Sequence, residues 1–255
     1  MNIAVCVKQV PARDWRPRVN EARTWVHDQD ASFELNEPDA YALEEALRLK
    51  ERHGGQVVVC SAGPARVAQV LREALARGAD RAIHVEDDRL ADADAGMTAA
   101  ALAAAMRDEQ FDLVLTGLQS DDQGYAQVGV VLAERLGLPY ATIIMEVQVA
   151  DGALRVRREL EGGWFQWVAL PLPALLTIQS GINQLRYATL KGIMAAKKKE
   201  IRRVAAPADL PPSLRVVSLS APEKRKETRM ITGPPAEAAK MLVSALRDEA
   251  RVIEP

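Results

Sequence analysis

The chain has 255 residues, of which 48% are hydrophobic and 27% charged, a balance typical of a globular α/β protein. A formal net charge of −2 and an aromatic content of 4% give no support to nucleic-acid binding. No apolar run reaches the roughly 18 residues that would predict membrane insertion. Cys6 and Cys60 lie in apolar, strand-like runs, which indicates buried thiols in a reducing compartment. The N-terminal segment lacks the basic region of a secretory signal, so we expect a cytoplasmic protein.

The first half of the chain alternates between strand-like and helix-like segments. Residues 2–8 are short, β-branched and nearly all apolar, as in a buried parallel strand. Residues 36–51 form the strongest helical pattern, with Asn36 as N-cap and Pro38 in the first turn. The remaining strands are predicted at 56–61, 81–86 and 112–116, and the remaining helices at 65–77, 93–108 and 126–136. This alternation predicts an open, mostly parallel sheet with flanking helices.

The pattern changes after Pro139. Three alternating segments, 141–149, 153–159 and 164–169, predict an antiparallel extension with turns at Asp151-Gly152 and Gly162-Gly163. Residues 174–178 predict a further buried strand. The aromatic residues of 164–167 cannot all be buried in an alternating strand, and we expect the exposed ones at a subunit interface.

A proline-containing linker, 205–212, separates the rest of the chain from a final amphipathic helix at 236–250. We therefore divide the chain into an α/β domain, 1–204, and a linker with a helical arm, 205–255. The residues alone are compatible with an arm that packs on another subunit and with one that folds back.

Four loops are expected at the carboxyl ends of the parallel strands, where open α/β sheets bind ligands: 8–11, 36–39, 62–64 and 117–129. The last loop, GLQSDDQGYAQVG, enters a helix, so the amides of Ala126, Gln127 and Val128 are candidate donors to a phosphate. Asp122 could hold a ribose hydroxyl or cap the helix. The loop has neither Walker nor GxGxxG spacing, and a structural loop explains it equally well.

Catalytic and metal chemistry find no support. The three histidines are far apart and share no ligand spacing with the cysteines. No nucleophile elbow is present. Asp121 and Asp122 are adjacent on a loop, where a pair of carboxylates is more often exposed to solvent than catalytic. We expect a protein that is not an enzyme, with no catalytic residue and no metal site.

Residues 182–201, INQLRYATLKGIMAAKKKEI, combine a polar segment, a short helix and a lysine run. A surface helix with cations at its C-terminus explains the spacing. The order of Asn183, residues 186–190, Ile193-Met194 and residues 196–198, however, resembles the signature of the electron transfer flavoprotein beta subunit. In that family this stretch is the recognition loop, whose leucine enters a pocket of dehydrogenase partners. The resemblance implies that the docking residues here are Leu190, Tyr187, Ile193 and Met194.

The resemblance covers nearly the whole chain, including VKQV at 7–10, LEEALRLKE at 43–51, ALARGADRAIHV at 74–85, DLVLTGLQS at 112–120 and PALLT at 173–177. It implies a Rossmann-like fold, a C-terminal arm that packs on an alpha subunit, an FAD shared with that subunit, and AMP bound by this chain. The implied AMP-binding positions are Cys6, Asn36, Glu37, Pro38, Asp39, Ala62, Gly117, Gln119, Asp122, Ala126, Gln127 and Val128.

The family carries electrons from flavin dehydrogenases, such as the acyl-CoA dehydrogenases of fatty acid beta-oxidation, to a membrane quinone oxidoreductase or a similar acceptor. Asn36-Glu37-Pro38 departs from the family's Asn-Pro turn, and Gln127-Val128-Gly129 resembles bifurcating members, which carry a second FAD in place of AMP. The lysine that is methylated in some members corresponds to Ala195. The alternatives are therefore a bifurcating carrier with a second FAD and an adenine-nucleotide-binding regulator of the universal-stress type.

Overall fold

The computed structural model describes residues 1–150, 152–222 and 228–253, arranged in two compact units, Met1–Ser218 and Leu219–Pro255. The second unit contains α6 (Pro235–Ser244), which continues into a π-helical turn, Ala245–Glu249. The predicted turn residue Asp151 lies outside the described residues. The predicted division of the chain after residue 204 stays a prediction.

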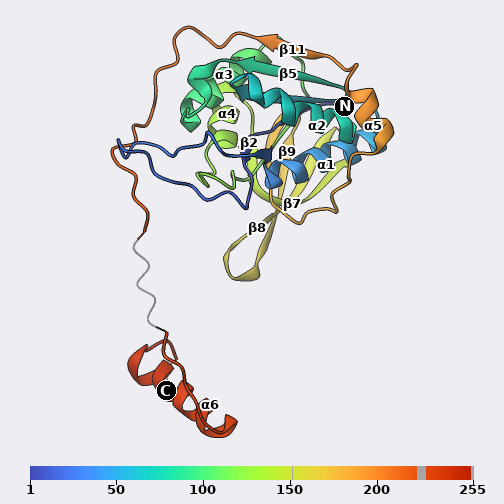
Figure 1. Cartoon of the computed structure of the whole chain (residues 1–255). Helices are drawn as coiled ribbons and strands as arrows, with labels where there is room; N and C mark the ends of the chain where they lie inside the picture. The colour runs from blue at the N-terminus through green and yellow to red at the C-terminus, as the bar shows by residue number, and fades with distance from the viewer. Residues whose placement is uncertain (151, 223–227, 254–255) are drawn as a thin grey trace. The chain divides into compact units, whose positions relative to one another are not determined.

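The first unit is built on a nine-stranded sheet, which confirms the predicted fold class (Figure 1). The strand order is β11 (Ile201–Val204), β5 (Arg81–Glu86), β4 (Gln56–Gly63), β1 (Asn2–Cys6), β6 (Leu113–Gly117), β10 (Ala174–Ile178), β7 (Tyr140–Ala150), β8 (Ala153–Glu159) and β9 (Phe165–Pro171). The pairings from β11 to β7 are parallel, and those of β7 with β8 and of β8 with β9 are antiparallel. A separate two-stranded sheet pairs β2 (Gln9–Pro11) with β3 (Phe33–Leu35).

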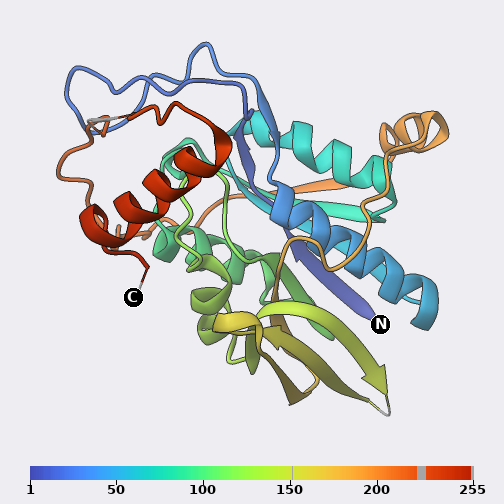
Figure 2. The ribbon, with the colours of Figure 1, turned by 90° about the horizontal axis from the view of Figure 1, so that it is seen from below.

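Helices cover both faces of this sheet (Figure 2). Alternate residues of β1 point to opposite sides, so Ile3 and Val5 pack under α1 (Glu37–His53) and α2 (Ala68–Arg77). Ala4 and Cys6 pack under α3 (Ala95–Met106) and α4 (Val128–Leu136). Short 3₁₀ turns occur at Ala65–Val67, Asp88–Leu90 and Glu161–Gly163. The central strands β4, β1, β6 and β10 are therefore enclosed between two helical layers, which explains their nearly continuous apolar sequences.

Helix α1 follows the predicted amphipathic pattern. Its predicted stripe is fully buried: Ala42, Leu43, Ala46, Leu47 and Leu49. Asn36 occupies the N-cap position, but its side chain makes no capping hydrogen bond. The side chain instead contacts the loop 117–129.

The structure shows two features near residue 200 that the sequence did not predict. Ile201–Val204, which precedes the predicted linker, forms the edge strand β11 parallel to β5. The lysine run follows the C-terminus of its own helix, α5 (Leu190–Ala196), as expected. In addition, Nζ of Lys199 donates to the carbonyls of Leu75 and Ala79, so it satisfies the C-terminal end of α2.

The antiparallel extension exposes its aromatic residues. Trp164, Phe165 and Trp167 are all exposed, and the guanidinium groups of Arg155 and Arg157 stack on Trp167 and Phe165 at 4.2 and 4.6 Å from the ring centroids. Aromatic and arginine side chains are enriched at protein interfaces. A subunit interface on this hairpin stays a prediction.

No helix among the described residues is both long enough and apolar enough to cross a bilayer. A search of the same residues for clustered histidine, cysteine and carboxylate side chains finds no group that could hold a metal ion.

Candidate functional site

The strand order places a topological switch point beside β1, and we call the region between the loops at this point the crevice. From β1 the chain proceeds outward through β4 and β5, and then crosses to β6 on the other side of β1. Beyond the carboxyl ends of β1 and β6, the connections leave the sheet in opposite directions. This topological switch point is where open α/β sheets bind ligands.

Asp39 joins the two strand ends at this point. Its Oδ2 accepts the backbone N–H of Lys8, just after β1, at 2.7 Å, and its Oδ1 accepts the N–H of Gly117, at the end of β6, at 2.9 Å. Burial raises the pKa of the Asp39 carboxyl to about 7, although the two N–H donors and Asn36 favour the ionised form. A β-carbon at Gly117 would collide with Asp39 and Pro38, so only glycine permits this close approach.

Asn36 fixes the loop that follows β6. Its Nδ2 donates to the carbonyl of Gln119 at 3.0 Å, and its Oδ1 accepts the N–H of Asp121 at 2.9 Å. Asn36 is almost fully buried, so these bonds satisfy an amide that water cannot reach. The residue predicted as a helix cap therefore connects the start of α1 to the loop 117–129.

Lys8 places a cation over the same loop. Its Nζ lies 2.7 and 2.8 Å from the carboxylate oxygens of Asp122, and it also donates to the side chains of Ser120 and Gln123. Asp122 therefore pairs with Lys8 and does not cap α4. Lys8 was not among the predicted site residues. Its position immediately after β1 was the signal that could have identified it.

The predicted phosphate donors lie at the start of α4. Ala126 has a positive φ of 54°, Gln127 is the N-cap residue, and Val128 begins the helix. Within the part of the chain that the structure describes, the N–H groups of these three residues have no hydrogen-bond acceptor. Gly129 lets the first turn of α4 lie close to the sheet. A β-carbon at this position would collide with Cγ2 of Thr177 at 2.6 Å and with Oγ1 of Thr116 at 2.7 Å.

The remaining predicted residues lie at two neighbouring strand ends. Cys6 and Cys60 are buried register partners in β1 and β4, and burial raises the pKa of both thiols. Ala62 is partly buried and precedes Gly63, where φ is +151°. A β-carbon at Gly63 would lie 2.8 Å from Cγ2 of Val67.

The outer rim of the crevice is charged. Glu37 pairs with Arg13, and Asp121 lies 3.8 Å from the same guanidinium. Pro38 is buried in the first turn of α1, and Gln119 is exposed. The structure thus brings all the predicted nucleotide positions to one edge of the sheet, together with Lys8 and Arg13.

The second predicted site, segment 182–201, is held by α1 and α2. Nδ2 of Asn183 donates to the carbonyl of Tyr41 and to Glu45, and Nη2 of Arg48 donates to the carbonyl of Gln184 at 2.9 Å. At the other end, Arg72 of α2 donates to the carbonyls of Ala196 and Lys199, both at 2.6 Å.

Between these anchors the segment exposes the four residues that were predicted to dock a partner, which we call the docking patch: Tyr187, Leu190, Ile193 and Met194. Tyr187 and Leu190 are 88% and 78% exposed, and the other two are 46% and 57% exposed. Thr189 caps α5 by accepting the N–H of Gly192 at 3.0 Å. The patch is therefore apolar, exposed and carried by a helix with a fixed start.

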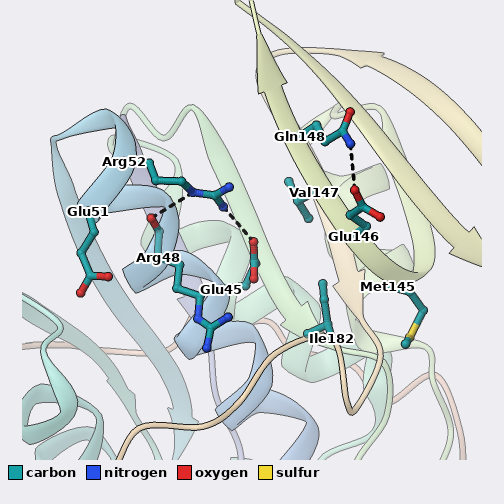
Figure 3. Close-up of a pocket in the computed structure, with 9 residues that line it drawn as sticks. All are labelled: Glu45, Arg48, Glu51, Arg52, Met145, Glu146, Val147, Gln148 and Ile182. Carbon is teal, nitrogen blue, oxygen red and sulfur yellow. Dashed lines mark hydrogen bonds and ion pairs between the residues drawn. The ribbon is translucent and has the colours of Figure 1, made fainter.

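Two open pockets flank the polar part of this segment. One, of about 560 Å³, lies between α1 and β7 and includes Arg48, Arg52, Glu146 and Ile182 in its lining (Figure 3). The other, of about 620 Å³, lies between α1, α2 and the segment, and includes Glu51 and Arg186. Neither pocket contains residues of the crevice.

The fold and the two sites define a doubly wound α/β subunit with a polar crevice at the switch point and a separate apolar docking patch. The electron transfer flavoprotein domain model matches residues 24–209. The chain is 38% identical to the electron transfer flavoprotein subunit beta of Methylophilus methylotrophus, over 97% of this chain and 98% of that protein. It is also 38% identical to the same subunit of Bacillus subtilis, over 89% and 91% of the two chains. The chain therefore belongs to the beta subunits of the electron transfer flavoprotein family.

Proposed function

We propose that this chain forms a cytoplasmic heterodimer with an alpha subunit and carries electrons from flavin dehydrogenases, such as acyl-CoA dehydrogenases, to a quinone oxidoreductase or a similar acceptor. The family assignment supports a subunit of an electron carrier over a universal-stress-type regulator. The exposed docking patch is the observation that carries this proposal. A carrier needs an exposed apolar surface to bind its redox partners, and a nucleotide-binding regulator has no use for one on this helix.

The crevice binds AMP in this proposal. The three free N–H groups at the start of α4 suit a phosphate, and the ammonium of Lys8, paired with Asp122, adds positive charge to the same loop. Asp39, Asn36 and Gly117 position the loops without themselves having free hydrogen-bonding capacity for the phosphate. The nucleotide then has a structural role: it ties the loops of the strand ends together and stabilises the folded state by linkage.

The FAD lies mainly on the alpha subunit, and this chain supplies one wall through residues near Val10–Arg13 and Asn36–Asp39. When bound, the flavin supplies the electron-carrying chemistry. The side chains of this chain position the rim: Arg13 is held by Glu37, and the pKa of Arg13 is raised by this hydrogen bond. The helical arm of the second unit packs on the alpha subunit and contributes to flavin retention.

The amount of each nucleotide tests the proposal. Acid release from the purified heterodimer is expected to yield about one AMP for each FAD. Lys8→Gln should lower AMP retention roughly tenfold or more, because it removes the cation of the loop and leaves the carboxylate of Asp122 without its partner beside the phosphate. The exposed Lys191→Gln is the control. Two FAD per heterodimer without AMP, together with flavin reduction by NADH, would instead establish the bifurcating alternative, since the same helix start suits the pyrophosphate of a second FAD.

A further inference from the structure

Arg186 lies immediately before the docking patch and is held by two carboxylates of α1. Its Nε donates to Oε2 of Glu44 at 2.8 Å, and its Nη1 donates to Oε1 of Glu51 at 2.6 Å. Its Nη2 reaches the second oxygen of each carboxylate, both at 3.2 Å. The backbone N–H of Arg186 also donates to Glu44 at 3.2 Å, so one carboxylate fixes both its side chain and its main chain. Such multidentate arginine contacts determine geometry as well as energy.

Glu44 is held as firmly as Arg186. The carboxylate is buried, and Arg48, one turn further along α1, donates to Oε1 at 2.7 Å. Burial alone would raise the pKa of Glu44, but the hydrogen bonds from Arg186 and Arg48 hold it below the ordinary value. The same hydrogen bonds with Glu51 and Glu44 raise the pKa of Arg186. The pair is therefore ionised at neutral pH, and burial of Glu44 protects it from screening by salt.

The contacts around Arg186 have a direct consequence for the patch. Tyr187 is the next residue, and Leu190 follows three positions later at the start of α5. Arg72 holds the far end of α5 on α2. Without Arg186, the hydrogen bonds that remain between α1 and the described residues of the segment are those of Asn183 and Gln184, which lie further from the patch along the chain (Figure 3 shows their α1 partners Glu45 and Arg48). Leu185 and Ile182 add apolar packing against the core, which is not directional.

We propose that Arg186 is a positioning residue for partner docking: through Glu44 and Glu51 it fixes the main chain from which Tyr187 and Leu190 project. This inference rests on the proposed role of the patch as the surface that binds the dehydrogenase. A preformed patch loses less conformational freedom on binding, so the contribution of Arg186 is made inside this chain and not across the interface.

Amide exchange of the complete heterodimer tests the positioning role without any partner. Arg186→Gln and Glu44→Gln are expected to accelerate exchange of the hydrogen-bonded amides of Gly192 and Ile193 at least tenfold, and Glu51→Gln, whose carboxylate is more exposed, is expected to do so less strongly. Arg77→Gln is the matched control. Arg77 and Arg186 line the same pocket between α1, α2 and the segment, but Arg77 pairs with Glu73 of its own helix. Unchanged exchange in Arg186→Gln would overturn the inference.

Electron transfer tests the consequence, with an acyl-CoA dehydrogenase reduced by its substrate as the probe. Arg186→Gln is expected to raise the half-saturating concentration of the heterodimer about 5–20-fold and to leave the rate at saturation and the flavin spectrum unchanged. In the Leu190→Ala background the same substitution should have a much smaller effect, because both act through one patch. An undiminished effect there would show that Arg186 contacts the partner directly and would refute positioning. If Leu190→Ala alone has no effect while Arg186→Gln still accelerates exchange, the docking proposal fails and the structural role of Arg186 stands.

Discussion

Gly192 of α5 lies directly against the carbonyl oxygen of Ala76 in α2. A β-carbon built at position 192 falls well inside the contact distance of that oxygen, and it also lies 3.3 Å from Oγ1 of Thr189. The helix that carries the docking patch can therefore approach α2 only because residue 192 has no side chain.

Gly192→Ala should displace α5 from α2. We expect a loss of about 1–3 kcal/mol in the free energy of unfolding, as for other substitutions that overpack a close contact. Electron transfer from the dehydrogenase should weaken while flavin content is retained. Thermal unfolding and electron-transfer kinetics measure the two effects. Lys191→Ala, at an exposed position of the same helix, is the comparison for a substitution that places no new atom against α2. Equal behaviour of the two variants would show that the contact with Ala76 is unimportant.

Leu190→Ala should weaken binding of the dehydrogenase by roughly 1–3 kcal/mol, the range of truncations at interface hot spots. The side chain is exposed in this chain, so the free energy of unfolding should change little. Electron transfer at limiting carrier concentration is the measurement. Leu214→Ala removes an equally large exposed side chain outside the patch and should leave the kinetics unchanged. A loss of the same size in both variants would contradict specific docking by Leu190.

Asp39 should make stability depend on pH in the direction opposite to most carboxylates. Burial raises its pKa in the folded state to about 7, so the folded protein binds a proton that the unfolded chain releases near pH 4. The resulting stabilisation is complete below about pH 4 and is lost as the pH rises to about 7, with an upper limit of about 4 kcal/mol.

Comparison of Asp39→Asn with the unmodified protein isolates this contribution. The amide cannot accept from both Lys8 and Gly117, so the variant should be less stable at every pH. Its stability should nevertheless fall less between pH 5 and 7.5. Melting temperatures at a series of pH values provide the measurement, and parallel profiles for the two proteins would exclude Asp39 as the titrating group.

Deletion of residues 222–255 should weaken association with the alpha subunit and increase the loss of FAD. The apolar side chains Met241, Leu242 and Val243 of α6 are exposed in this chain, and burial on a partner would contribute favourable free energy. Sedimentation and flavin absorbance after dilution report the two quantities. If the truncated chain binds the alpha subunit with unchanged affinity and retains its full content of FAD, the arm has no role in assembly.

The apolar patterns predicted most of the fold because burial between two helical layers leaves little choice of residue. The strands β5, β8 and β10 begin and end where the patterns predicted. Strand β11 was missed because Arg202 and Arg203 resemble a basic linker. In the structure they pair with Glu109 and Glu86, which the sequence places more than 90 positions away.

The polar contacts of the sites were the least predictable. The nucleotide positions were identified by resemblance, because the loop alone was equally compatible with a phosphate site and with a structural loop before a capped helix. The ion pair of Lys8 with Asp122 joins residues 114 positions apart. In the sequence, Glu44 and Glu51 cannot be distinguished from the other charged residues of an amphipathic helix. Such contacts depend on which strand and helix ends meet in space, and periodicity carries no information on that.

The side-by-side thiols of Cys6 and Cys60 provide two chemical reporters at the floor of the crevice. Both are buried, and their raised pKa values leave almost no thiolate at neutral pH, so a thiol reagent can react only after this part of the sheet opens. The alkylation rate therefore measures the opening equilibrium at the strand ends on which the loops are mounted. A ligand that bridges those loops should slow alkylation in proportion to its occupancy, which provides an affinity measurement that needs neither the flavin spectrum nor a redox partner.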